Sequence, residues 1–94
     1  MRRIVVSARA AREVDDAYAY YSQHGRGEAF MACVDRAFER ITDRPLMYPV
    51  SYDIVRRALL QRFPYSVFFV VEDDHVVVLA VSHQRRDPAT RPTP

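Results

Sequence analysis

The 94-residue chain contains no lysine, and all 14 of its basic side chains are arginine. Without lysine the protein cannot form a lysine Schiff base, contact a phosphate through a P-loop lysine or use a lysine general base. Arginine does not replace it, because the guanidinium stays protonated. The two glycines, Gly25 and Gly27, do not supply a glycine-rich phosphate loop. The composition therefore excludes the chemistry of P-loop nucleotide enzymes and of lysine-dependent catalysts.

Cysteine and long apolar runs are also scarce. The single cysteine, Cys33, allows no intramolecular disulfide and no cysteine-rich zinc site, which favours the cytoplasm. His75 and His83 would lie about 26 Å apart on one strand, so we propose no metal site. The apolar stretch 4–6 is too short for a signal peptide, and runs such as 76–81 are far below the ~20 residues that cross a bilayer. We therefore expect no membrane segment.

The N-terminal half has helical periodicity after a short strand. Residues 2–7 are β-branched enough for a strand, and Ser7 is a suitable N-cap for an amphipathic helix over 8–24. Gly25-Arg26-Gly27 interrupts the pattern, and a second helix runs to Arg44, where Pro45 prevents its continuation. We predict a helical hairpin followed by a loop, 45–49, without regular structure.

The C-terminal half has strand periodicity. It predicts strands over 54–63, 65–72 and 75–83, with Asp73-Asp74 as a two-residue turn that sets Val70 opposite Val77. The predicted fold class is α+β, in the order β-αα-βββ. The N-terminal strand and helical hairpin pack on one face of a mainly antiparallel four-stranded sheet. We expect one domain over residues 1–88 and an extended proline-rich tail over 89–94.

Two of the predicted strands are apolar on both faces, at 67–71 and 76–81. One helical hairpin covers only one face of such a sheet, so the other face requires a second cover. A partner protein is one interpretation. The alternative is that the loop 45–49 and the tail fold over this face.

The net charge of +2 conceals an uneven distribution. Segments 54–63 and 84–91 together hold six arginines and one acid, a net +5, while the remainder has eight arginines and 11 acids, a net −3. We expect Arg62, His83, Arg85 and Arg86 to cluster at one sheet edge, with Arg56 and Arg57 about 20 Å along the strand. Arginine suits phosphate, so nucleic acid or an acidic protein segment is the expected partner, unless these charges are solvated or internally paired. His83 is either a general acid or base or a structural residue.

The ordered motifs Arg62-Phe63-Pro64-Tyr65 and His83-Gln84-Arg85-Arg86-Asp87-Pro88 resemble the RelE/ParE superfamily of toxins from type II toxin-antitoxin modules, of the plasmid-stabilisation type. The resemblance extends to about Pro88. It implies a compact bacterial toxin without cofactor or metal, neutralised in a hetero-oligomer by a cognate antitoxin that wraps the toxin. The antitoxin would cover the second sheet face through four apolar residues: Phe68, Val70, Val77 and Leu79.

The superfamily has two branches with different targets. The nuclease branch cuts ribosome-bound mRNA, and Arg57 and Arg86 match two of its basic positions, with His83 left for acid-base chemistry. Ser66, Leu59 and Pro92 stand where that branch has basic or aromatic residues.

The ParE-like branch poisons DNA gyrase, inhibits growth and is not an enzyme, and the ending at 83–88 is closer to it. An inactive antitoxin-binding module is a third hypothesis. In the ParE-like interpretation the target would meet a basic edge made of five arginines: Arg56, Arg57, Arg62, Arg85 and Arg86.

Overall fold

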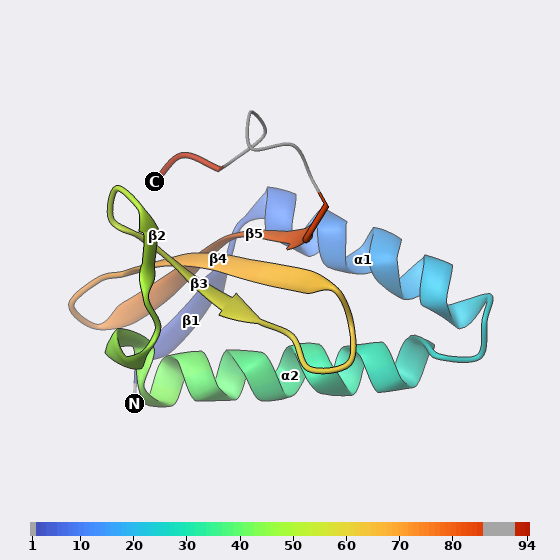
Figure 1. Ribbon diagram of the computed structural model, residues 1–94. Coiled ribbons are helices and arrows are strands. Elements are labelled where there is room, and N and C mark those ends of the chain that lie inside the picture. Colours follow the sequence, from blue (N-terminus) through green and yellow to red (C-terminus); the bar gives the residue numbers. More distant parts are fainter. Residues whose placement is uncertain (1, 86–91) are drawn as a thin grey trace.

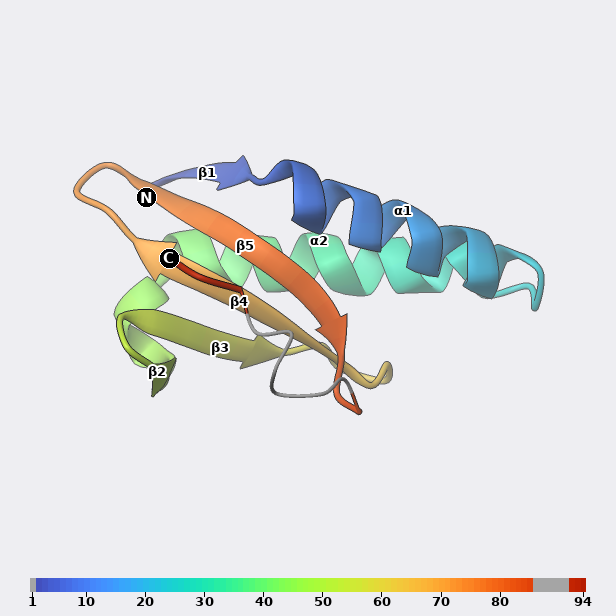
Figure 2. The ribbon, with the colours of Figure 1, turned by 90° about the horizontal axis from the view of Figure 1, so that it is seen from above.

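The longest strand, β5 (His75–His83), lies inside a five-stranded sheet with the order β1-β5-β4-β3-β2. The computed structural model describes residues 2–85 and 92–94. Strand β1 pairs with β5 in parallel, and the other neighbours are antiparallel. Helix α2 (Gly27–Asp43) lies across one face of this sheet, and α1 (Ala8–Ser22) runs beside β5 at its edge (Figures 1 and 2). The remaining strands are β1 (Arg3–Val6), β2 (Val50–Tyr52), β3 (Val55–Leu59) and β4 (Tyr65–Val71).

The helical hairpin confirms the predicted α+β class. Helix α1 (Ala8–Ser22) begins where predicted, because the Ser7 hydroxyl accepts a hydrogen bond from the Ala10 N–H at 3.0 Å. Gly25 has a φ of +71°, which glycine adopts without steric cost, and it lets the chain reverse into α2 (Gly27–Asp43). Both helices turn their apolar stripes toward the sheet.

The core lies between the helices and the sheet. Its largest fully buried side chains on this side include Phe30, Val34 and Ile41 from α2 and Phe69 from β4. Phe30 stacks on Tyr21 at 5.2 Å between ring centroids and meets Phe63 edge-on at 5.3 Å. Such aromatic pairs add to the stabilisation from burial alone. The C-terminal sheet is thereby fastened to the hairpin end of the two helices.

The β4–β5 hairpin has the predicted register. Val70 lies opposite Val77, and the Glu72 N–H donates to the His75 carbonyl at 2.8 Å across the Asp73-Asp74 turn. One irregularity follows, a register shift at Phe68 and Phe69. The two-residue turn therefore sets which side chains of β5 face the helices as far as Val78, and the extra residue Leu79 then shifts the alternation so that Val81 packs in the core.

Three expectations about the middle of the chain need correction. The sheet has five strands rather than four, because Val50–Tyr52 pairs with β3. Residues 45–47 form a 3₁₀ turn, so the prediction of no regular structure over 45–49 was wrong: the fixed φ of Pro45 suits the first position of a helix. The predicted strand 54–63 ends at Leu59, since Arg62 takes a φ of +73° in the turn to β4.

The second sheet face is partly closed by the chain itself. Val55 and Val70, which lie outside the main core cluster, are only 0% and 4% exposed. Pro92 is buried, and the Tyr52 hydroxyl donates a hydrogen bond to its carbonyl. In Figure 1 helix α2 lies on one side of the sheet and the C-terminal end on the other. Residues 92–94 thus lie over part of this face, whereas Tyr48 of the 45–49 segment packs on Phe69 in the main core.

The β4–β5 turn contains a carboxylate with a perturbed pKa. The hydrogen bond with the His75 ring, at 2.7 Å from Nδ1, and the nearby Arg3 guanidinium hold the pKa of Asp74 below its ordinary value of 3.8. We expect an NMR pH titration to find this lowered pKa, and His75→Ala to move it back toward 3.8. A depressed pKa gives a stabilising contribution that is present above the unfolded pKa and is lost as the pH falls through the folded pKa. An unchanged Asp74 titration in the His75→Ala variant would contradict this assignment.

Candidate functional site

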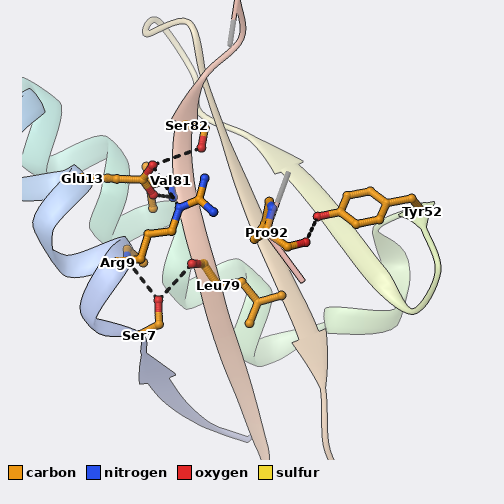
Figure 3. Close-up of polar contacts among 9 residues, drawn as sticks. Ser7, Arg9, Glu13, Tyr52, Leu79, Val81, Ser82 and Pro92 are labelled. Carbon is orange, nitrogen blue, oxygen red and sulfur yellow. Dashed lines mark hydrogen bonds and ion pairs between the residues drawn. The ribbon is translucent and has the colours of Figure 1, made fainter. Parts of the chain in front are cut away.

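Helix α1 completes the edge of β5 that β1 leaves open. Strand β1 ends at Val6, opposite Val78, and the Ser7 N–H still donates to the Val78 carbonyl at 3.0 Å. Beyond that point the Ser7 hydroxyl donates to the Leu79 carbonyl at 2.9 Å, and the Val81 N–H donates to Glu13 Oε1 at 2.9 Å (Figure 3). The side chains of the N-cap residue Ser7 and of Glu13 in α1 therefore take the place of a neighbouring strand.

Glu13 is held firmly in this position. Its other carboxylate oxygen lies 3.4 Å from the Ser82 hydroxyl and 3.5 Å from Arg9 Nε, one helical turn back. The Glu13 side chain is only 13% exposed, so its charge stays largely out of water and depends on these partners. The seam between α1 and β5 is accordingly polar, and it carries a fixed carboxylate.

His83 lies at the end of β5, next to this seam. It pairs with Tyr65 of β4, with 5.3 Å between ring centroids, and its Nδ1 accepts a hydrogen bond from the Arg85 N–H at 3.1 Å. The Gln84 N–H donates to the Pro64 carbonyl at 2.8 Å, which ties the end of β5 to the turn before β4. These contacts fix the imidazole at the sheet end.

A hollow of about 190 Å³ opens between α1 and this end of the sheet. Carboxylates dominate its charge, because Glu13 and Asp16 line it beside the His83 ring. A phosphate approaching His83 through this hollow would meet two negative side chains at short range. The full lining is Glu13, Asp16, Ala17, Tyr20, Tyr65, Val81 and His83.

The predicted basic edge is divided by the structure. Arg62 and Arg85 are exposed, and each follows a strand at the same end of the sheet, consistent with the predicted cluster. Arg56 and Arg57 lie further along and face opposite sides of β3. The half-buried Arg56 donates to the Tyr48 carbonyl at 2.6 Å, which is a structural contact, whereas Arg57 is exposed opposite Phe68. Arg86 lies outside the described residues, as does the rest of the motif through Pro88.

Arg26 belongs to this end of the molecule although the charge count by segment missed it. Its guanidinium carbon lies 4.6 Å from the centroid of the Phe63 ring and 5.9 Å from that of Tyr21. Such cation–π contacts hold an arginine in place without neutralising it. In the sequence Arg26 is marked only by its place in the Gly-Arg-Gly turn, and no periodicity connects this turn with the distant strands. We call Arg26, Arg62 and Arg85 together the basic end.

The sequence profile described as "ParE toxin of type II toxin-antitoxin system, parDE" matches residues 4–88. The chain belongs to the ParE toxin family. A solved structure described as a chromosomal ParDE toxin-antitoxin system from P. aeruginosa has the same fold, with a TM-score of 0.66. It is 21% identical to this chain, and the alignment covers 88% of this chain and 96% of the other. No curated protein sequence matches.

Family membership confirms the ParE-like branch of the resemblance. This ParE-family chain is thus a toxin of a type II toxin-antitoxin system. Within residues 2–85 and 92–94, no helix is long and apolar enough to cross a membrane. The same residues contain no group of three histidine, cysteine or acidic side chains placed to share a metal ion.

Two of the three residues proposed for a nuclease, His83 and Arg57, lie on opposite sides of the sheet in this ParE-family toxin. His83 pairs with Tyr65, which packs against the main core, so both side chains lie on the helix side of the sheet. Arg57 pairs with Phe68, whose place in β4 turns it to the opposite side. With Arg86 outside the described residues, the pair that can be compared is separated by the sheet itself.

The four residues predicted to bind an antitoxin are apolar positions of β4 and β5. Phe68, Val70 and Val77 alternate with core residues and so face away from the helices, and Figure 3 shows Leu79 pointing toward the side where Tyr52 and Pro92 lie. Val70 is buried, and the other three are half-buried. Part of the predicted surface is therefore available and part is already covered.

We expect Glu13→Ala to lower the free energy of unfolding by about 1–3 kcal/mol, because it leaves the part-buried Val81 N–H without its acceptor. Glu13→Gln retains an acceptor oxygen and should lose less. The matched control is Asp16→Ala, which removes an exposed carboxylate from the same hollow. Urea denaturation measures the stabilities, and amide exchange at Val81 reports the local bond. Equal effects of Glu13→Ala and Asp16→Ala would contradict the role of this contact.

Proposed function

We propose that this toxin inhibits DNA gyrase by binding it through the basic end, and that a cognate antitoxin neutralises it in the cytoplasm. The observation that carries the proposal is the separation of His83 from Arg57, which places the available nuclease candidates on opposite faces of the sheet. Membership of the ParE toxin family supports the same interpretation. The proposed toxin acts by binding and performs no bond-breaking step of its own.

The arrangement of charge supports binding to an anionic surface. Arg62 and Arg85 are exposed cations at one end of a thin sheet, and Arg26 is held beside them on the Phe63 ring. Arginine forks pair with carboxylates or with phosphates, so acidic patches of gyrase and the DNA that it holds are both suitable contacts. The carboxylates beside His83 favour contact at the rim rather than within the hollow.

The antitoxin would cover apolar surface that a monomer otherwise exposes. Phe68, Val77 and Leu79 remain half-buried on the face opposite the helices, where no further layer of secondary structure covers them within the described residues. An apolar segment of the antitoxin would remove this area from water, and this burial is the main source of affinity in such complexes.

A gyrase supercoiling and cleavage assay with purified toxin tests the target. We expect inhibition by the wild-type toxin, and a loss on the order of tenfold in potency for the double variant Arg62→Ala/Arg85→Ala, since two charge contacts are removed. Arg40→Ala, an exposed arginine near the other end of α2, is the matched control and should retain full potency. No effect of wild-type toxin at micromolar concentration, together with codon-phased cuts by primer extension on translated mRNA, would replace this proposal with the nuclease alternative.

A further inference from the structure

A row of four valines crosses the sheet on the face opposite the helices. Val5 pairs with Val77, and Val77 pairs with Val70. Val55 comes next in the row, because the adjacent residue Arg56 pairs with Phe69. The exposed fraction changes along the row from 48% at Val5, through half-buried Val77, to 4% at Val70 and 0% at Val55. One half of a continuous apolar row is therefore open and the other half is closed.

The chain's own C-terminal residues lie over the closed half. Pro92 is buried, and its carbonyl accepts a hydrogen bond from the hydroxyl of Tyr52, whose ring lies 6.2 Å from that of Phe68. Figures 1 and 2 both place the C-terminal end over β4 on the side away from α2. Aromatic side chains that enclose a proline and donate to its carbonyl are the means by which proteins bind extended proline-rich segments. We call residues 92–94 the strap.

We propose that the strap is an internal competitor of the antitoxin. In the free toxin it occupies part of the apolar row that an antitoxin segment covers in the complex, and it leaves when the antitoxin binds. This inference rests on the proposed neutralisation by an antitoxin. The row from Val5 to Val55 spans about 14 Å across four strands, a length that a few extended residues or two to three helical turns of a partner would cover.

The continuity of the row is the reason for competition. A partner that covers the open half meets Val5 and Val77, and the next apolar side chain along the row is the buried Val70 of β4, the strand over which the C-terminal end lies. Among the described residues, the Tyr52 hydroxyl ties this short strap to the sheet, and releasing the strap costs little compared with releasing an entire packed helix. The antitoxin would bind only toxin molecules whose strap is open, so its apparent affinity would be reduced in proportion to the open fraction.

The test uses Tyr52→Phe, which keeps the ring and removes the hydroxyl, and a chain that ends at Arg91. Tyr48→Phe is the matched control, because Tyr48 packs on Phe69 on the other side of the sheet. Binding is measured by calorimetry against the purified product of the gene adjacent to the toxin gene. We expect both test variants to bind this protein about fivefold more tightly or better than wild type, the effect of losing one hydrogen bond that closes the strap. Tyr48→Phe should bind as wild type does.

Two further measurements follow the strap and the surface directly. The heteronuclear ¹⁵N relaxation of the Thr93 amide should show an ordered strap in the free toxin and a freely moving one in the saturated complex. Binding of an apolar dye to the free toxin should rise in Tyr52→Phe and in the shortened chain, but not in Tyr48→Phe.

The outcomes separate this inference from the proposed function. Tight binding of the antitoxin with Thr93 still ordered, or with unchanged affinity in both strap variants, would overturn the competition while leaving neutralisation intact. Failure of the adjacent gene product to bind any of the four proteins would instead contradict the proposed antitoxin. A shortened chain that has lost cooperative unfolding would be replaced by Tyr52→Phe as the deciding variant.

Discussion

The unpaired edge of β5 beyond Val78 is the constraint on which the rest of this structure depends. Strand β5 continues to His83, but its parallel neighbour β1 ends at Val6, so backbone groups from Leu79 onward face a helix instead of a strand. Buried backbone groups require partners, and Ser7 and Glu13 of the α1 segment supply them. The same Ser7 hydroxyl caps α1, so the start of the helix and the completion of the sheet are one structural feature.

The hydrogen bond between Glu13 and the edge of β5 also determines the charge of the candidate site. Because Glu13 must accept from Val81, a carboxylate is fixed beside His83 whatever the function of the surface. The exposed arginines of the basic end are not among the residues that line the hollow. A histidine placed among carboxylates and separated from Arg57 by the sheet is poorly arranged to stabilise a transferring phosphate, whereas an exposed arginine rim is well arranged to bind an acidic surface.

The sequence predicted those parts of the fold in which a local signal coincides with tertiary contact. The 3.6-residue apolar period predicted both helices, and Ser7 marked the N-cap of the first. The Asp73-Asp74 turn predicted the register of the β4–β5 hairpin. Strand β2 was missed because three residues carry no measurable period. The early end of β3 was missed because Arg62 adopts a positive φ that is unusual for a residue with a side chain.

The candidate site was less predictable, because facing and pairing depend on residues far apart in sequence. Adjacent arginines in a strand must point to opposite sides, so Arg56 and Arg57 could never form one patch, yet only the pairing with Phe69 and Phe68 shows which side each takes. The contact between Arg26 and Phe63 joins the turn between the two helices to the turn before β4 and has no local signature in the sequence.

The composition did indicate that the second sheet face needed a cover. The structure shows that residues 92–94 meet part of that need, because they lie over β4, where Pro92 is buried and accepts a hydrogen bond from the Tyr52 hydroxyl. A small α+β domain with one helical hairpin can therefore bury one face completely and the other only in part, and the part left open is the surface most suited to a partner.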